Sequence, residues 1–449
     1  LKGAPLAARQ SRIRGGCLDP ARRLSIVGRA QRARRTDMPP LLSLDDALAR
    51  LVAGAEAARI VETDNISTFD ALGRVLAADV VSAIDVPPAD NSSMDGYALR
   101  LSDVPQAGML LPVSQRIPAG VVGEALAAGT AARIFTGAQV PAGADAIVMQ
   151  EQCEPVDGGV RINTVPQAGQ WVRRRGEDVR IAATVLARGT RLTPQALGLA
   201  AGVGAARLTV CRHPRVALFS TGDELVMPGA VAPADLPPGA IYNSNRFTLR
   251  GLLQAAGCQV TDLGIVPDRA SATRDALRRA AAAHDLILSS GGVSVGEEDH
   301  IRPEVAAEGR IELWQIAIKP GKPLAFGAVR RDAIGEALFI GLPGNPVSSF
   351  VTFLLAVAPV LRALQGLAAA LPEPWPLPAH FDWPRPDKRR EFLRVRRDAR
   401  GGLELFPNQS SGVLTSAVWA DGLVDNPPGH AIAHGDVVRY LPLAGLVGH

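Results

Sequence analysis

Three polar, glycine-containing segments each follow a short apolar run in the second half of the chain. They are residues 220–224 (STGDE), 289–299 (SSGGVSVGEED) and 341–346 (GLPGNP). Glycines let the backbone approach a ligand closely, and carboxylates are oxygen ligands that suit a hard cation such as Mg²⁺. A single segment of this kind is equally well explained as a tight turn. Three of them favour a site for a phosphorylated ligand and a metal.

The side chains in these segments supply the first candidate contacts. Acidic candidates for the metal are Asp223, Glu224, Glu298 and Asp299. Small or backbone contacts to the ligand are expected from Ser220, Gly222, Gly291, Gly292, Ser294, Gly296, Pro343, Gly344, Asn345 and Pro346. Pro346 is expected early in a helix, where the free N–H groups of the first turn can bind an anion.

Two basic clusters accompany the acidic segments. Residues 319–323 (KPGKP) place Lys319 and Lys322 on a stiff turn, and residues 389–394 (RREFLR) hold three arginines. Each cluster could be a solvated turn or an exposed strand edge. Next to anion-binding loops, the lysines are better placed to bind an oxyanion or a phosphate.

Two further polar runs lie upstream. Residues 90–97 (DNSSMDGY) hold more polar groups around a glycine than a surface turn needs, and residues 173–178 (RRRGED) combine three arginines with two acids. A surface turn and a solvated charge run remain the alternative interpretations.

Apolar runs and capping residues predict the elements that carry these segments. Strands are expected at 216–219, 260–263, 286–288 and 338–340. Helices are expected after the caps at 243–245 and Ser271, and from Pro346. Alternating strands and helices predict a doubly wound parallel α/β domain over 211–365, in which ligands bind beyond the carboxyl ends of the strands.

The rest of the chain divides by composition. Residues 38–84 and 166–210 are expected to form a mixed, elongated module around a β-rich module at 85–165. A proline-rich linker is expected at 366–386, followed by a small β domain at 387–449. The apolar run near 347–361 is short and interrupted by polar residues, so it predicts a core helix and no membrane span.

Charge is unevenly distributed. The whole chain has a net charge of +4, whereas residues 1–37 contain ten basic and two acidic residues, so residues 38–449 carry −4. We expect residues 1–37 to be a disordered leader, and an acidic body gives little electrostatic support for nucleic-acid binding. The four cysteines are widely spaced, which fits a reducing cytoplasm.

Residues 292–296 (GVSVG) also match the nucleophile elbow of α/β-hydrolases, with His430 and His434 downstream. The elbow requires a helix directly afterwards, but three acidic residues and Pro303 follow here. Acids beside a serine nucleophile would oppose an oxyanion, so a hydrolase is the weaker interpretation.

From Leu41 to the C-terminus the ordered motifs together resemble the molybdopterin molybdenumtransferase family, which includes bacterial molybdenum insertases and the E domain of gephyrin. The resemblance includes residues 85–97, 135–138, 173–178 and 410–412 besides the segments above. It implies an enzyme that takes adenylated molybdopterin and molybdate, cleaves the bond to AMP with Mg²⁺, and places molybdenum on the dithiolene. It also implies a homodimer with sites shared between subunits, and a transient contact with the molybdopterin adenylyltransferase.

The resemblance assigns roles by position. The functional acids are expected to be Asp95, Asp178, Glu224, Asp268 and Asp299, and the metal ligands to be Asp223, Glu224, Asp268 and Asp299. Substrate contacts are expected from Thr136, Arg173, Lys319, Lys322, Pro343, Pro346, Arg390, Arg394, Ser410 and Ser411.

Gln315 departs from the family, which usually has a basic residue four positions before Lys319. Oxyanion affinity is therefore expected to be weaker unless Arg394 compensates. An adenylyltransferase would share the α/β domain without needing the modules at 85–180, and a non-catalytic scaffold would be expected to lose some of the acids. Molybdate and tungstate cannot be separated by these residues.

Overall fold

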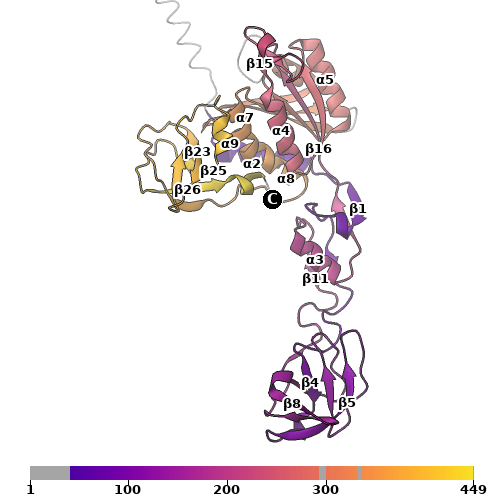
Figure 1. Cartoon of the computed structure of the whole chain (residues 1–449). Coiled ribbons are helices and arrows are strands. Elements are labelled where there is room, and N and C mark those ends of the chain that lie inside the picture. Colours follow the sequence, from indigo (N-terminus) through magenta and orange to yellow (C-terminus); the bar gives the residue numbers. More distant parts are fainter. Residues whose placement is uncertain (1–40, 293–299, 332–334, 448–449) are drawn as a thin grey trace, which may run out of the picture.

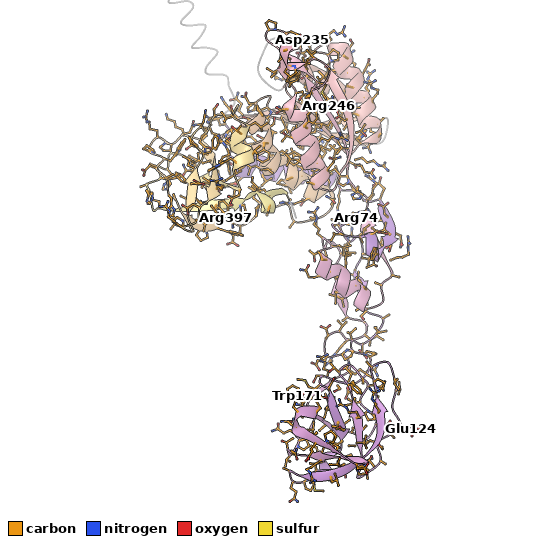
Figure 2. All side chains as sticks on the ribbon, in the orientation of Figure 1. Arg74, Glu124, Trp171, Asp235, Arg246 and Arg397 are labelled. Atoms are coloured by element: carbon orange, nitrogen blue, oxygen red, sulfur yellow. The ribbon has the colours of Figure 1, made fainter. Side chains whose placement is uncertain are left out.

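The computed structural model describes residues 41–292, 300–331 and 335–447. The molecule is elongated (Figure 1). The α/β domain and the C-terminal β domain lie side by side at one end, a narrow arm leads away from them, and a β-rich module forms the far end. Trp171 and Glu124 lie in that far module, well separated from Arg246 and Arg397 (Figure 2).

The β-rich module forms a six-stranded sheet with the order β7-β4-β6-β5-β9-β8. Strand β4 is buried along its whole length, because Tyr97 and Leu99 face one apolar cluster and Ala98 faces another. The β-rich prediction for this region therefore agrees with the structure, but Trp171 and Val172 also pack here and extend the module beyond 165. The strands are β4 (Gly96–Leu99), β5 (Met109–Ile117), β6 (Ala131–Ile134), β7 (Ala146–Met149), β8 (Cys153–Val156) and β9 (Gly159–Ile162).

The arm consists of chain segments that run outward to the β-rich module and return. Short antiparallel pairs join the two directions, and the last of them lies where the arm meets the β-rich module. Helix α3 (Pro194–Gly202), capped by the side chain of Thr193, packs with the other two pairs. Leu76, Leu192, Leu208 and neighbouring apolar residues form its small core. The paired strands are β1 (Thr63–Ser67) with β12 (Arg207–Cys211), β2 (Val80–Val81) with β11 (Thr184–Leu186), and β3 (Asn91–Ser92) with β10 (Val172–Arg173).

The α/β domain is built on a mixed sheet with the order β16-β13-β17-β21-β20-β18. The first four strands are parallel and match the four predicted from apolar runs. Two antiparallel strands that the sequence patterns did not predict complete the sheet. The strands are β13 (Arg215–Thr221), β16 (Gln259–Val266), β17 (Leu286–Ser290), β18 (Gly309–Gln315), β20 (Pro323–Arg330) and β21 (Glu336–Leu342).

Helices cover both faces of this sheet, as a doubly wound fold requires. Asn243 caps α4 by accepting a hydrogen bond from the backbone of Arg246, as predicted. The cap predicted for α5 was wrong, because Ser271 lies inside that helix and Arg269 precedes it. The helices are α4 (Ser244–Ala255), α5 (Ala270–Ala283), α6 (Ile301–Glu308), α7 (Pro346–Thr352) and α8 (Ala358–Leu364), and a π-helical turn (Phe353–Val357) joins α7 to α8.

Helix α2 (Leu44–Ala57) belongs to the core of the α/β domain. Ser43 caps it as its sequence suggests, and Leu44, Leu51 and Ala55 pack in the same apolar cluster as Phe353. The predicted assignment of residues 38–84 to the elongated module was therefore wrong for this helix. The apolar face of α2 packs against α8. Residue spacing predicts that such a face is buried, but it does not identify the element that covers it.

The continuous helical stretch Pro346–Leu364 is long and apolar enough to cross a membrane, but 89% of it is buried inside the protein. It packs beside α2 as part of the largest apolar cluster, which also contains residues of the sheet. The predicted core helix is confirmed.

The C-terminal domain is a six-stranded sheet in which β19 (Ile318–Lys319) is the first strand. Strand β22 (Trp375–Pro378) pairs with β26, so the predicted linker over 366–386 is partly a strand of this domain. The other strands are β23 (Arg390–Arg397), β24 (Leu403–Leu405), β25 (Gly422–Asn426) and β26 (Val437–Pro442), with the short helices α9 (Thr415–Trp419) and α10 (Leu443–Val447) beside them.

Candidate active site

A cavity of about 780 Å³ opens at the carboxyl ends of the parallel strands. Its wall includes the ends of β13, β17 and β21, the lysine turn after β19, and the loop at 409–411 of the C-terminal domain. The cavity therefore lies at the edge where a doubly wound sheet binds its ligands. Predicted residues that line it are Gly222, Glu224, Asp268, Gly291, Gly292, Lys319, Lys322, Pro343, Gly344, Asn345, Pro346, Ser410 and Ser411.

Asn245 ties the strand-end loops together. This residue lies in the first turn of α4 and is 9% exposed. Its Nδ2 donates to the Oγ of Ser290 over 2.8 Å and to the carbonyl of Gly344 over 2.7 Å. From the sequence, Asn245 was predicted only as part of a helix cap, although its side chain links two of the predicted ligand-binding loops.

The cavity floor requires glycine at position 291. Gly291 has a φ of +88°, and a Cβ there would lie 2.6 Å from the carbonyl oxygen of Thr221. Any side chain would meet both backbone strain and a steric clash. This close approach lets the loops after β13 and β17 lie side by side under the cavity.

Two carboxylates, Glu224 and Asp268, face the cavity. Asp223 does not line it, and its carboxylate instead accepts a long 3.5 Å hydrogen bond from the backbone N–H of Asp268. Four other candidates lie outside the described residues: Ser294, Gly296, Glu298 and Asp299. Among the residues that are described, no group of three His, Cys, Asp or Glu side chains is close enough to hold a metal. Glu224 and Asp268 can still hold Mg²⁺ together with phosphate oxygens, because Mg²⁺ is commonly bound by one or two carboxylates and its substrate.

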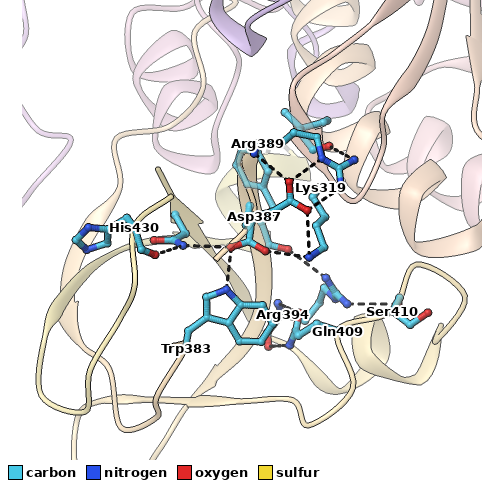
Figure 3. A network of polar contacts seen from close by, with 12 residues as sticks. Lys319, Trp383, Asp387, Arg389, Arg394, Gln409, Ser410 and His430 are labelled. Carbon is cyan, nitrogen blue, oxygen red and sulfur yellow. Dashed lines mark hydrogen bonds and ion pairs between the residues drawn. The ribbon is translucent and has the colours of Figure 1, made fainter. Parts of the chain in front are cut away.

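Lys319 is the central cation of a polar network between the two domains (Figure 3). Its Nζ lies 3.2 Å from Glu391 and 3.5 Å from Asp387, while part of the side chain faces the cavity. Arg389 holds Asp387 through two guanidinium N–H groups, which keeps the pKa of that carboxyl far below its usual range. Lys322 has no recorded ion pair within the described parts of the chain, so it is the more available cation.

Among the predicted contacts in the α/β and C-terminal domains, three described residues do not line the cavity. Ser220 is fully buried in β13. Arg390 pairs with Asp425 and Asp45, joining β23 to α2. Arg394 is 1% exposed, and burial lowers the pKa of its guanidinium to about 10.

Arg394 instead supports the loop that borders the cavity. Its guanidinium donates to the carbonyls of Phe392 and Ser410 and to the Oγ of Ser416. Side chains alternate along strand β23, so Arg390 and Arg394 share the side on which Phe392 packs into the apolar core. Both arginines therefore make contacts within the protein and are not exposed clamps. Arg389, which precedes the strand, is the arginine that reaches the cavity, together with Gln409, Ser348 and Thr221, none of which we predicted as contacts.

The four upstream candidates lie in the distant part of the molecule (Figure 1). Asp95 and Thr136 form one pair, because both the N–H and the hydroxyl of Thr136 donate to the same carboxylate oxygen over 2.8 Å. These two hydrogen bonds lower the pKa of Asp95. Thr136 therefore orients Asp95, in addition to the substrate contact that we predicted for it.

Arg173 and Asp178 lie on the neighbouring loop, which ion pairs fasten to the segment before Asp95. Arg174 pairs with Asp90 over 2.7 Å, and Arg175 pairs with Asp85 over 2.6 Å. The run of charges at 173–178 is thus partly structural. None of the four upstream candidates lines the cavity of the same chain.

Comparison with known proteins connects this arrangement to one family. Residues 42–204 match the MoeA N-terminal region (domain I and II), residues 217–363 match a probable molybdopterin binding domain, and residues 376–443 match the MoeA C-terminal region (domain IV). The chain is 40% identical to the molybdopterin molybdenumtransferase of Haemophilus influenzae over 342 residues, which cover 76% of this chain and 81% of that protein. It is 37% identical to molybdopterin molybdenumtransferase 2 of Mycobacterium tuberculosis H37Rv, over 83% of this chain and 93% of the relative.

A solved structure shows the same architecture. The molybdopterin biosynthesis MoeA protein from Pyrococcus horikoshii OT3 superposes with a TM-score of 0.77 at 28% sequence identity, and the match covers 89% of this chain and 99% of that one. Three family regions matched in order, with such identities across most of both chains, show that this chain belongs to the molybdopterin molybdenumtransferase family.

Proposed function

We propose that this protein is the enzyme that inserts molybdenum into molybdopterin. In this proposal it takes adenylated molybdopterin and molybdate, places molybdenum on the dithiolene and releases AMP. One observation carries the proposal: a single cavity brings two carboxylates, two lysines and three strand-end loops together at the ligand-binding edge of the α/β sheet. Its family membership supports a role in molybdenum cofactor biosynthesis.

The chemistry of the cavity suits cleavage of a phosphoanhydride, which depends mostly on positioning and on neutralising negative charge. Glu224 and Asp268 would hold Mg²⁺, which when bound offsets the charge on the phosphate oxygens. Lys319 and Lys322 would hold the tetrahedral molybdate dianion as point charges. The N–H groups at the start of α7, after Asn345, would bind a phosphate or the pterin.

The test supplies adenylated molybdopterin, Mg²⁺ and molybdate, and follows AMP release and molybdenum incorporation. Wild-type protein should release AMP in a molybdate-dependent way, and Glu224→Gln should be slower by orders of magnitude. Glu404→Gln is a matched control, because Glu404 forms an exposed ion pair with Arg396 and does not line the cavity. Molybdate-independent AMP release, or full activity in Glu224→Gln, would contradict the proposal.

We further propose that two chains form a homodimer in which each site combines the cavity of one subunit with Asp95, Thr136, Arg173 and Asp178 of the other. The support is the distance between these groups within one elongated chain (Figure 1). A transient contact with the adenylyltransferase that supplies the substrate would fit a labile adenylated intermediate.

Subunit mixing tests the shared site. Asp178→Asn and Glu224→Gln should each be inactive alone. After unfolding and joint refolding, random pairing should restore about a quarter of the wild-type sites, because one site of each mixed dimer carries neither change. If both variants are inactive alone and the mixture recovers no activity although mixed dimers form, each site is built within one chain.

A further inference from the structure

The carboxylate of Glu391 is buried beside the cavity lysine. Its side chain is 1% exposed, and one oxygen lies 3.2 Å from the Nζ of Lys319 (Figure 3). The lysine side chain is 39% exposed and lines the cavity. A fully buried negative charge therefore lies directly behind a cation that faces the ligand.

Glu391 is held rigidly from two sides. Its other oxygen accepts a hydrogen bond from the indole N–H of Trp383 over 2.8 Å and a longer one from Asn426 over 3.4 Å. Its backbone pairs in register with Lys319 of β19 on one side and with Asn426 of β25 on the other. The carboxylate cannot withdraw when a ligand approaches Lys319.

Asp387, the second acidic partner of Lys319, differs from Glu391 because an arginine also binds it. Asp387 lies 3.5 Å from the ammonium, but Arg389 binds both of its oxygens. In the described residues, Lys319 is the cation recorded in an ion pair with Glu391. Glu391 has Lys319 as its ion-pair partner and acts on Arg389 only through space, whereas Arg389 binds Asp387 directly and largely offsets its charge. The charge of Glu391 therefore acts mainly on Lys319 and on whatever binds there.

We propose that Glu391 is a positioning residue that sets how strongly the cavity holds an oxyanion. This inference rests on the proposed binding of molybdate at Lys319. An ammonium group has three N–H donors. Glu391 accepts a hydrogen bond from one of them, and Asp387 lies within ion-pair distance of the same ammonium, which leaves an N–H to point into the cavity.

The same carboxylate also weakens the bound state. Two consecutive hydrogen bonds of about 3 Å each place Glu391 within roughly 6 Å of an oxyanion on Lys319. Like charges at that distance repel appreciably even when partly screened. Glu391 thus keeps the oxyanion aligned but exchangeable, as a site needs when it passes its metal on.

Isothermal titration of the full-length protein with molybdate tests this role. Glu391→Gln keeps the size of the side chain and removes its charge, so molybdate should bind about tenfold more tightly. Glu391→Asp retains the charge and should bind no more tightly than wild type. Glu404→Gln, which removes an exposed charge on the same sheet, should leave the affinity unchanged. If Glu391→Gln does not fold, Glu391→Leu provides a second neutral variant of similar volume.

Tighter molybdate binding by a neutral variant points to the lost charge of Glu391 as the cause, because damage to the fold would weaken binding. Unchanged or weaker molybdate binding by a folded neutral variant overturns the role of Glu391. Absence of molybdate binding by the wild type would instead refute the oxyanion site itself, so the two failures can be told apart.

Discussion

Asn245 offers the sharpest test of how the cavity is held together. Its amide nitrogen has two N–H groups, which donate to Ser290 and Gly344, with a longer 3.5 Å contact to the Oγ of Ser349. Replacement by alanine removes both hydrogen bonds, detaches α4 from two ligand-binding loops, and leaves space behind Gly344. We therefore expect Asn245→Ala to destabilise the α/β domain and to loosen its cavity.

The size of the effect follows from the contacts. Each lost hydrogen bond costs about 1 kcal/mol. The Oγ of Ser290 is buried and adds a desolvation penalty, whereas the exposed residue Gly344 can bind water instead. Alanine regains a few tenths of a kcal/mol in helix propensity. The net loss is about 2 kcal/mol, which for a domain of this size lowers its melting temperature by roughly 4–8 °C.

Differential scanning calorimetry measures this shift, and titration with molybdate shows whether the loosened loops bind less well. Asn163→Ala is the matched control, because Asn163 is exposed and has no recorded side-chain hydrogen bond to a described residue. Its melting temperature should stay close to that of the wild type, because most surface substitutions change the free energy of unfolding by no more than about 0.5 kcal/mol. Equal melting temperatures for Asn245→Ala and wild type would refute the inference that Asn245 clamps the loops.

Three further substitutions probe other parts of the molecule. Thr136→Val removes one hydrogen bond to Asp95 and should raise its pKa toward the ordinary 3.8, as carboxyl NMR titration would show. The stability that this lowered pKa contributes is present above about pH 4 and is lost as the pH falls through the folded-state pKa of Asp95. The variant should therefore be less stable than wild type at neutral pH, and the difference should shrink as the pH is lowered. Arg394→Leu, measured by thermal melting, should cost about 3 kcal/mol, because it leaves buried acceptors unpaired. Gly96→Ala should prevent stable folding of the β-rich module, because the new Cβ would lie 2.0 Å from the carbonyl oxygen of Val148. Limited proteolysis should then cleave the chain within this module.

Each of these has a contrary outcome. An unchanged Asp95 pKa in Thr136→Val would show that the backbone N–H alone sets it. A melting temperature of Arg394→Leu equal to wild type would mean that water replaces the guanidinium. Protease resistance of Gly96→Ala would mean that the β4–β7 pair can separate without loss of the module.

Local patterns were sufficient for elements whose signals lie within a few residues. The apolar runs at 216–219, 260–263, 286–288 and 338–340 all became parallel strands, and Ser43 and Asn243 cap the helices that they precede. Strands β18 and β20 were not predicted. Their pairing depends on neighbours in the sheet more than on their own residue pattern.

Local patterns did not predict which elements pack together when those elements are distant in the sequence. Helix α2 was assigned to the wrong module because a helix stripe predicts burial but not the surface that buries it. The linker prediction failed at 375–378 for a related reason, since Pro376 and Pro378 fit an edge strand as well as a linker.

The candidate site shows the same division. The residue types alone indicated phosphate loops, carboxylates and cations, and the parallel strand order required the loops to meet at one edge. Only the tertiary structure decided that Arg389 faces the cavity while Arg394 is buried behind it, because strand register determines which side chains face the ligand.

By itself, then, the sequence determined the four parallel strands of the α/β sheet, the edge at which their carboxyl ends meet and the chemical character of the loops there, since these depend on local periodicity and composition. The three-dimensional arrangement decided the elongated shape, the distance between Asp95 and the cavity, and the buried pairing of Glu391 with Lys319. Those features arise from contacts between residues that are distant in the chain, which no local pattern encodes. Lys319 and Glu391, for example, are 72 positions apart.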